Sequence, residues 1–228
     1  MIFLDLLFPP KTTCIICGEN IKSGYLCENC EHKLEFIHGN ICNICGKPIE
    51  NKGICSDCNS YGHIFKKNRS VFEYKGVIKD LIARFKYFKE RDLADFFAQY
   101  IKEVIEEEKW PIDLIVPVPL HKAKLDERGY NQSELLAREI SYKLDILMSK
   151  ALRRIKNTPT QTVLHREERI KNVKGAFNVT YKNAVEGKNI LLIDDVMTTG
   201  ATIDECARIL KEYGAGDIYV ATIARGKN

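Results

Sequence analysis

The stretch Asn189-Ile-Leu-Leu-Ile-Asp-Asp-Val-Met-Thr-Thr-Gly-Ala-Thr202 decides the fold of this chain. Its aliphatic run, residues 190–193, is typical of a parallel strand whose two faces are both covered by helices. The strand ends at two acids. Threonine hydroxyls, backbone N–H groups and a glycine follow where a helix begins, a combination that binds anions. Because a carboxylate repels phosphate, the acids would bind hydroxyls or a metal. The stretch therefore predicts a ligand that carries a phosphate next to a polyol, such as a ribose 5-phosphate.

This stretch resembles the signature of the type I phosphoribosyltransferases, which has four aliphatic residues, two acids and a Thr-Thr-Gly-x-Thr loop. The resemblance implies that Asp194 and Asp195, the candidate catalytic residues, hold the ribose 2′ and 3′ hydroxyls of phosphoribosyl pyrophosphate. It also implies Mg²⁺, bound mainly through that ligand. The loop would wrap the 5′-phosphate with the candidate ligand-binding residues Thr198, Thr199, Gly200, Ala201 and Thr202. The alternative interpretation is an ordinary buried strand followed by a capped helix.

A second aliphatic strand is expected at residues 113–117, where two prolines remove backbone donors and end the pairing. The same resemblance implies that the loop after this strand binds the pyrophosphate. Residues 118–122 are therefore the candidate for that loop, with Val118 and Lys122 as ligand-binding residues. A helix is expected to begin within residues 129–133 and to run to about residue 144, with Asn131 or Ser133 near its N-cap.

Eight of the nine cysteines form Cys-x-x-Cys pairs, and the second set of four repeats the first with a shift of 28 positions. Four thiolates complete a tetrahedral zinc site, and segments this short cannot bury enough apolar surface to fold alone. The sequence predicts a double zinc ribbon with two zinc ions, bound by Cys14, Cys17, Cys27, Cys30, Cys42, Cys45, Cys55 and Cys58. A cross-braced ligand set is the alternative to the sequential one, which the repeat favours. The ninth cysteine, Cys206, is expected in the core.

The chain has 228 residues, enough for one sizeable core and a small appended module. We expect an N-terminal segment and double zinc ribbon at residues 1–62, and a phosphoribosyltransferase-like domain at residues 63–228. Residues 1–8 are apolar but too short to span a bilayer, and we expect them to dock onto the core. Without a leader or a longer apolar run, the protein is expected to have no membrane span and to be cytoplasmic.

The second unit is expected to be an α/β domain with a mostly parallel sheet flanked by helices. Apolar residues recur at helical spacing in residues 78–88, Phe88 included, and again in residues 93–104. Strands are expected at residues 69–74, 148–152 and 217–224, and a helix at residues 201–213 with Cys206 on its apolar face. Arg225 would then belong to a short polar tail.

The net charge of +4 does not by itself indicate a nucleic-acid partner, but the charge is unevenly distributed. Residues 121–175 contain 13 Lys and Arg against 7 Asp and Glu. That basic excess is compatible with binding to a phosphate backbone. The candidate nucleic-acid residues are Lys122, Lys124, Arg128, Arg154, Arg166 and Arg169.

The chain as a whole resembles the ComF competence family, which is related to GntX. Beyond the motifs above, the resemblance rests on Leu-Phe-Pro-Pro near the start, Val-Pro-Val-Pro-Leu-His at residues 116–121 and Arg-Gly-Tyr-Asn-Gln at residues 128–132. It implies a role in DNA uptake with single-stranded DNA as ligand, and a helicase-like translocase as partner. Residues 155–173 would be the flexible loop that closes over the substrate in phosphoribosyltransferases.

Three functions fit these features. The first is a binding protein of DNA uptake that holds phosphoribosyl pyrophosphate, or a phosphoribosyl end, and single-stranded DNA. The second is an active phosphoribosyltransferase with an unidentified base or amine acceptor, for which the zinc module is a scaffold. The third is a sensor of phosphoribosyl pyrophosphate whose closure changes what the ribbons bind.

Overall fold

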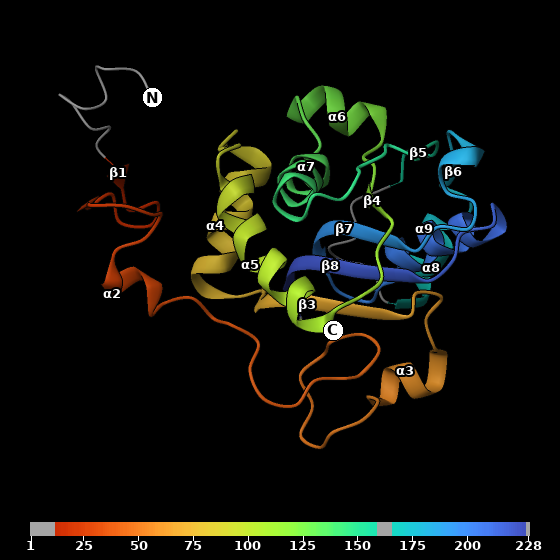
Figure 1. Ribbon diagram of the computed structural model, residues 1–228, viewed down its shortest axis with the longest axis horizontal. Coiled ribbons are helices and arrows are strands. Elements are labelled where there is room, and N and C mark those ends of the chain that lie inside the picture. The colour runs from red at the N-terminus through yellow and green to blue at the C-terminus, as the bar shows by residue number, and fades with distance from the viewer. Residues whose placement is uncertain (1–11, 159–165, 227–228) are drawn as a thin grey trace.

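The computed structural model of the chain describes residues 12–158 and 166–226 (Figure 1). Its N-terminal part contains the short elements β1 (Thr12–Thr13), β2 (Asn20–Ile21), α2 (Glu28–Glu31) and α3 (Ser56–Tyr61). The larger part that follows begins with β3 (Lys67–Glu73), α4 (Gly76–Tyr87), α5 (Leu93–Glu108), β4 (Leu114–Pro117), α6 (Lys122–Arg128) and α7 (Gln132–Leu144). It continues with β5 (Leu152–Arg154), α8 (Arg166–Val173), β6 (Phe177–Val179), η2 (Lys182–Ala184), β7 (Ile190–Met197), α9 (Ala201–Glu212) and β8 (Ile218–Arg225).

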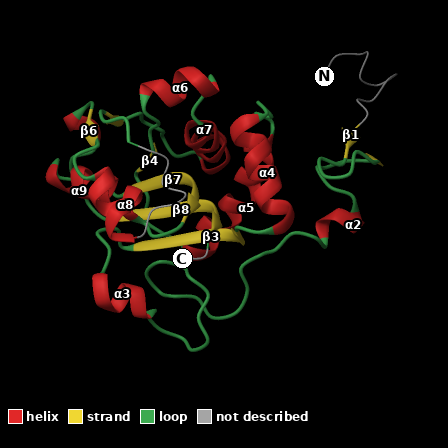
Figure 2. Ribbon diagram, turned by 180° about the vertical axis from the view of Figure 1, so that it is seen from behind, coloured by secondary structure: helices red, strands yellow, loops and turns green. Residues whose placement is uncertain are grey.

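The central sheet is parallel throughout and has the strand order β3-β8-β7-β4. Side chains of a strand alternate between the two faces of its sheet. Ile190 and Leu192 of β7 accordingly lie in one apolar cluster with α9, whereas Leu191 and Ile193 lie in another with α4, α5 and α7. Figure 2 shows these helical layers on either side of the strands. This two-sided burial is why residues 190–193, the first half of β7, are an unbroken aliphatic run.

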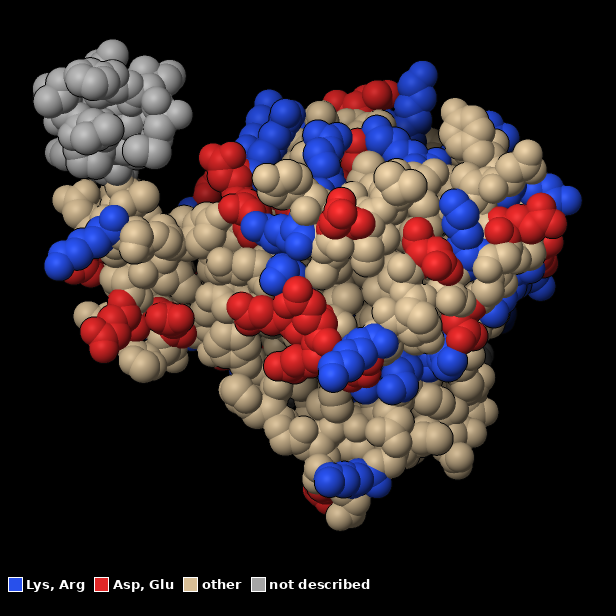
Figure 3. Space-filling view, viewed as in Figure 1, with Lys and Arg blue, Asp and Glu red and all other residues tan. Residues whose placement is uncertain are grey.

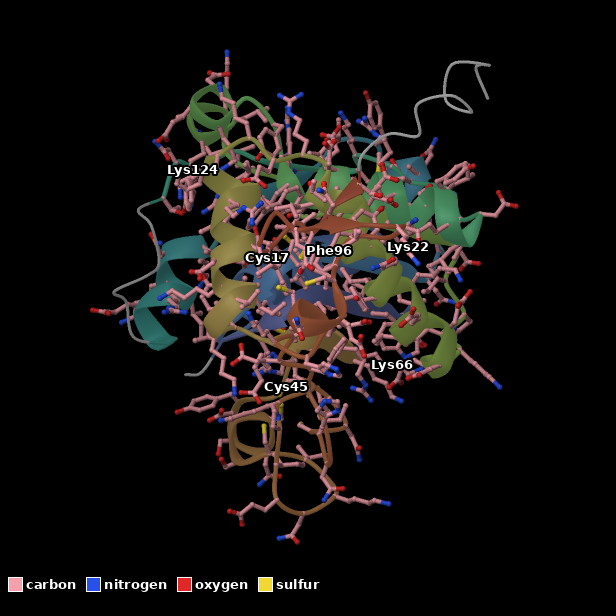
Figure 4. All side chains as sticks on the ribbon, turned by 90° about the vertical axis from the view of Figure 1, so that its left-hand side faces the viewer. Cys17, Lys22, Cys45, Lys66, Phe96 and Lys124 are labelled. Carbon is pink, nitrogen blue, oxygen red and sulfur yellow. The ribbon has the colours of Figure 1, made fainter. Side chains whose placement is uncertain are left out.

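The two cysteine-rich ribbons contact different parts of this domain. Arg84 of α4 donates a hydrogen bond to the carbonyl of Ile15, and the ring of Tyr25 packs on Phe96 of α5, so the first ribbon lies beside the helical layer. The second ribbon lies beneath the sheet, as Figure 4 shows for Cys45. The segment between the ribbons pairs with β3 through a bridge between Phe36 and Phe72, and it covers that edge of the sheet.

Several expected elements differ in the structure. Helix α6 was not expected, because it buries none of its seven residues and therefore shows no apolar periodicity. Phe88 was expected in the core, but α4 ends at Tyr87 and the Phe88 side chain is exposed. The strand expected at residues 148–152 is β5 at Leu152–Arg154, whereas Met148 forms an isolated bridge with Ile115.

Two other predictions need correction. Arg225 was expected in a polar tail, but it is the last residue of β8 and is buried. Its guanidinium donates a hydrogen bond there to the Cys45 carbonyl of the second ribbon. Residues 155–173 were expected to form a loop, and the last eight of them form α8. The docking expected for residues 1–8 lies outside the described residues. None of the helices within residues 12–158 and 166–226 is long and apolar enough to cross a membrane.

Candidate functional site

The eight paired cysteines form two clusters, each made of four consecutive cysteines of the sequence. In the second cluster the Cys42 and Cys58 sulfurs lie 3.6 Å apart and those of Cys45 and Cys55 lie 3.7 Å apart. A tetrahedral zinc site with Zn–S bonds of about 2.3 Å places its sulfurs about 3.8 Å apart, whereas a disulfide joins them at about 2.05 Å. Both clusters therefore fit zinc, and the ligand sets are sequential rather than cross-braced.

The second cluster is embedded in the larger domain. All four of its cysteines are buried, and they share the apolar cluster of β7 and α9. The carbonyl of Cys45 accepts hydrogen bonds from the amide of Asn68 (2.9 Å) and from the guanidinium of Arg225 (2.8 Å). The first cluster is more open to solvent, since Cys17 is exposed. The two zinc sites thus have different structural surroundings.

His63, just after the second ribbon, contacts the start of α9. Its ring nitrogen lies 2.7 Å from the carboxylate of Asp204, which also accepts the backbone N–H of Ile64. The His63 ring packs so closely on Gly200 that a Cβ there would lie 2.9 Å from it, and Gly200 has a φ of 84°. A glycine is thus required at this position both by its conformation and by its neighbour. The contact links the second ribbon to the threonine loop.

The threonine loop lines a small pocket at the carboxyl end of β7, together with Asp194. The N-cap of α9 is Gly200, which offers no side chain to the first turn, and the N–H of Ala201 makes only a long hydrogen bond of 3.4 Å to the Thr199 hydroxyl. Uncapped N–H groups at a helix N-terminus bind anions. Arg169 of α8 reaches the same place, where it donates a hydrogen bond of 2.6 Å to the hydroxyl of Thr198. The loop therefore has the geometry expected of a phosphate site.

The strand was expected to end at the two acids, but β7 runs on to Met197, so Asp194 and Asp195 lie within it and have different partners. The carboxylate of Asp194 accepts the hydroxyl of Ser133 and the backbone N–H of Asp195, both at 2.9 Å and both on Oδ1. Asp195 is buried against the helical layer, where it pairs with the Lys86 ammonium at 2.7 Å and accepts the side-chain amide of Gln132. Asp194 thus faces the pocket, and Asp195 is fixed from behind by α4 and α7.

Asp194 is hard to ionise in the free protein. Burial, followed by the negative charge of Asp195, raises the pKa of Asp194 to about 7, and the Lys86 charge only partly offsets this. A carboxyl group whose pKa is raised in the folded state stabilises the fold at low pH. That contribution is lost as the pH rises through the pKa of the folded state.

Asp194→Asn is therefore expected to stabilise the protein more at pH 8 than at pH 5. The two effects should differ by on the order of 2 kcal/mol in the free energy of unfolding, because each unit of pKa shift corresponds to about 1.4 kcal/mol. Urea unfolding of both proteins at the two pH values measures this difference, and effects on the zinc thiolates cancel because both proteins carry them. The same change in stability at both pH values would show that Asp194 titrates normally.

Cations lie near the acid pair, and only some of the candidate nucleic-acid residues are among them. Lys124 and Arg128 line a basic pocket of ≈ 210 Å³ with Lys86, next to Asp195. Burial and the charges of Arg154 and Arg128 lower the pKa of Lys124, so a bound anion would relieve repulsion there. Burial also lowers the pKa of Arg154, and the nearby Asp194 charge opposes this effect.

The remaining candidates have varied positions. Lys122 is exposed at the start of α6 and is not among the residues that line the basic pocket. Val118 is buried, and its N–H donates to the carbonyl of Ile193, which anchors the loop after β4 beside β7. Arg166 begins α8, but its side chain lies outside the described residues. Arg169 contacts the threonine loop, as described above.

Sequence reasoning missed several residues of this site. Gln132 and Ser133 hold the acid pair from the first turn of α7, where sequence reasoning predicted only a helix start. Sequence reasoning left Lys86 open only as a phosphate contact, and its pairing with Asp195 was not expected. His63 lies 141 positions from Asp204, so nothing local in the sequence predicts their contact.

Comparison with known proteins gives matches over both parts of the chain. A family model described as a double zinc ribbon domain matches residues 3–59, and one described as a phosphoribosyl transferase domain matches residues 130–228. Among solved structures, glutamine phosphoribosylpyrophosphate amidotransferase from B. subtilis matches with a TM-score of 0.43 and 18% identity. That match covers 61% of this chain and 30% of the amidotransferase chain.

Curated relatives match along most of the chain. Competence protein F of Haemophilus influenzae is 30% identical over 93% of this chain and 90% of its own length. Competence protein ComFC of Bacillus subtilis is 34% identical over 97% of this chain and 88% of its own length. DNA utilization protein YhgH of Escherichia coli is 32% identical over 68% of this chain and 70% of its own length. With its two cysteine clusters and its parallel sheet, the chain belongs to the ComF family of competence proteins, which combines a double zinc ribbon with a phosphoribosyltransferase-like domain.

Proposed function

We propose that this protein binds phosphoribosyl pyrophosphate, or the 5-phosphoribosyl end of a nucleic acid, and single-stranded DNA during DNA uptake. One observation supports the binding of the phosphoribosyl ligand, which is the ligand half of the proposal. The threonine loop and Asp194 share one pocket, and cations lie beside the acid pair. A ribose phosphate needs hydrogen-bond donors for its phosphate next to hydrogen-bond acceptors for its hydroxyls, and this pocket offers both. Mg²⁺ would enter with the ligand, bound mainly through its phosphates.

The described part of residues 155–173 supports a role for this segment in closing over the ligand, since Arg169 contacts the hydroxyl of Thr198. The names of the relatives and the basic excess of residues 121–175 support the DNA half. We assign the phosphoribosyl site to residues 63–228 and the zinc module to residues 1–62. The protein would act in the cytoplasm, with a helicase-like translocase of the uptake machinery as a partner of the zinc ribbons.

The DNA half is tested by filter binding at two salt concentrations. With three phosphate contacts, the affinity for a single strand should fall by about tenfold or more between roughly 50 and 200 mM salt, because bound cations release counterions from the strand. The Lys124→Gln/Arg154→Gln double variant should bind more weakly and with a smaller salt dependence. Absent binding, or binding that salt does not affect, would remove single-stranded DNA from the proposal.

An active phosphoribosyltransferase is the alternative. The site combines hydrogen-bond donors for a phosphate, hydrogen-bond acceptors for ribose hydroxyls, and cations, and this combination favours it. In that reaction a nucleophile forms a bond to the ribose C1 while the bond from C1 to pyrophosphate breaks. The acid pair would orient the ribose, and the cations would stabilise the leaving pyrophosphate. Pyrophosphate release across a panel of bases and amines tests this, with Asp194→Asn/Asp195→Asn as the control. Turnover no greater than that of the control would exclude it.

A further inference from the structure

The end of α4 and the neighbouring α6 form an unusual surface: Lys86, Tyr87, Lys89, Lys124 and Arg128 line one pocket, and the exposed Phe88 lies between Tyr87 and Lys89 in the chain. We call it the α4–α6 surface. Figure 3 shows several Lys and Arg side chains, with some Asp and Glu among them, over the part of the molecule that contains α4 and α6, and Figure 4 labels Lys124 of α6. One acid, Glu127, also lines its pocket. The surface is thus predominantly basic.

Two aromatic rings are exposed at the end of α4. Tyr87 is 67% exposed and Phe88 is 70% exposed. The guanidinium of Arg128 lies over the Tyr87 ring, 5.1 Å from its centre, so a cation and an aromatic face are already joined. Large exposed apolar side chains next to one another indicate an interaction site rather than packing.

The backbone here adopts a costly conformation. Lys89 has a φ of 61°, a left-handed conformation that a lysine seldom adopts and a glycine adopts freely. This turn ends α4 directly after Phe88 and leaves its ring outside the helical layer. The chain thus keeps a cation at a position where glycine would be less strained. The same left-handed conformation ends α5 at Lys109 and α7 at Asp145, so here it terminates the helix.

The α4–α6 surface also continues into the phosphoribosyl site. Lys86 lines the basic pocket, and its ammonium pairs with Asp195 at 2.7 Å. A ligand that crosses this surface would therefore reach the acid pair. Cations that follow a phosphate backbone, with aromatic faces on which bases stack, are the means by which proteins bind single strands without sequence preference.

We propose that the α4–α6 surface is the single-strand interface of this protein, on which bases stack against Tyr87 and Phe88 while the cations contact the phosphates. The inference rests on the proposed binding of single-stranded DNA and specifies where the strand lies. A folded acidic protein would also be attracted by the cations, but it would not need bases. A comparison of DNA that carries bases with the same backbone without bases therefore distinguishes a single-strand interface from a surface for an acidic protein.

The test compares an oligo-dT strand of about 20 nucleotides, which exceeds a typical site size, with an abasic strand of the same length. The wild-type protein should bind oligo-dT about tenfold more tightly than the abasic strand, because stacking contributes only when bases are present. Phe88→Ala should reduce this preference several-fold and Tyr87→Ala/Phe88→Ala should abolish it. Phosphoribosyl pyrophosphate binding by Phe88→Ala should be unchanged. Tyr142→Ala is the matched control, since Tyr142 is 86% exposed in the last turn of α7.

A second variant tests Lys89, the cation with a positive φ. Lys89→Gly should leave thermal stability unchanged or higher, since glycine relieves the positive φ. It should also lower the salt slope of DNA binding by about 0.7, the contribution of one phosphate contact on a single strand. A reduced slope in a stable variant supports the interface.

The inference is overturned if Tyr87→Ala/Phe88→Ala keeps the preference for bases. If the wild-type protein binds neither strand but binds phosphoribosyl pyrophosphate, both this inference and the DNA half of the proposed function fail, and the ligand site stands. If it shows the base preference but does not bind phosphoribosyl pyrophosphate, the interface stands and the ligand half of the proposed function fails.

Discussion

Replacement of Cys45 and Cys58 by serine is expected to unfold the phosphoribosyltransferase-like domain, whereas replacement of Cys17 and Cys27 is expected to unfold the first ribbon alone. The difference follows from where the clusters lie. The second cluster is buried in the core that contains β7 and α9, and Asn68 and Arg225 both donate to the carbonyl of Cys45. Without zinc, both of these buried donors would lose their acceptor.

The size of the effect follows from zinc energetics. A structural zinc site contributes roughly 10–16 kcal/mol to small zinc domains, which is comparable to the whole stability of a typical protein, about 5–15 kcal/mol. The first cluster has an exposed cysteine, and its ribbon is attached to the domain through contacts such as those of Ile15 and Tyr25. Its loss should cost far less.

Zinc content and thermal unfolding measure this prediction, with each double variant compared with the wild-type protein. The Cys17→Ser/Cys27→Ser variant should hold one zinc ion and keep a cooperative transition near that of the wild type. The Cys45→Ser/Cys58→Ser variant should lose that transition. Equal losses of stability in the two variants would show that the second ribbon does not support the domain.

Asp195→Ala is expected to destabilise the protein by about 3–5 kcal/mol, although it removes only a few atoms. The Lys86 side chain is only 18% exposed and its ammonium pairs with Asp195, and the amide of Gln132 donates to the same carboxylate. The carboxylate stabilises the charged form of Lys86: burial alone would lower the pKa of Lys86, but the Asp195 charge raises it. Removing one partner leaves the other charge buried and uncompensated, which accounts for the cost.

Chemical denaturation of a small set of variants separates this cause from a general packing defect. Asp195→Asn keeps an oxygen acceptor for Gln132 and should destabilise less than Asp195→Ala. Lys86→Met in the Asp195→Ala background should recover much of the loss, because no buried charge then remains unpaired. If Lys86→Met adds its own cost to that of Asp195→Ala, the two side chains are not coupled and the explanation fails.

The features predicted correctly are those that local sequence determines. Burial on both faces makes the first half of β7 an aliphatic run, so the strand, the threonine loop and the start of α9 could be read from 14 consecutive residues, although the strand extends past the acids to Met197. The zinc clusters could be read from cysteine spacing, since each ligand set is contiguous in sequence. Cys206 is buried on the apolar face of α9, as its helical spacing predicts.

The features that were missed depend on contacts between distant segments or on element ends. His63 meets Asp204, and Arg225 meets Cys45, because the second ribbon folds beneath the sheet, which no local pattern encodes. Phe88 fits the apolar period of α4, but the helix ends one residue earlier and the ring is exposed. Periodicity predicts which face of a helix is buried, whereas the residue at which burial ends depends on what packs next to it.

The account depends most on the claim that the pocket of Asp194 and the threonine loop holds a phosphoribosyl ligand. Titration calorimetry of the full-length, zinc-loaded protein with phosphoribosyl pyrophosphate and Mg²⁺ tests it directly. We expect one ligand per chain, binding that is lost in Asp194→Asn/Asp195→Asn, and no comparable heat from inorganic pyrophosphate alone. Absence of binding by the folded wild-type protein, or equal binding by the double variant, would contradict the account.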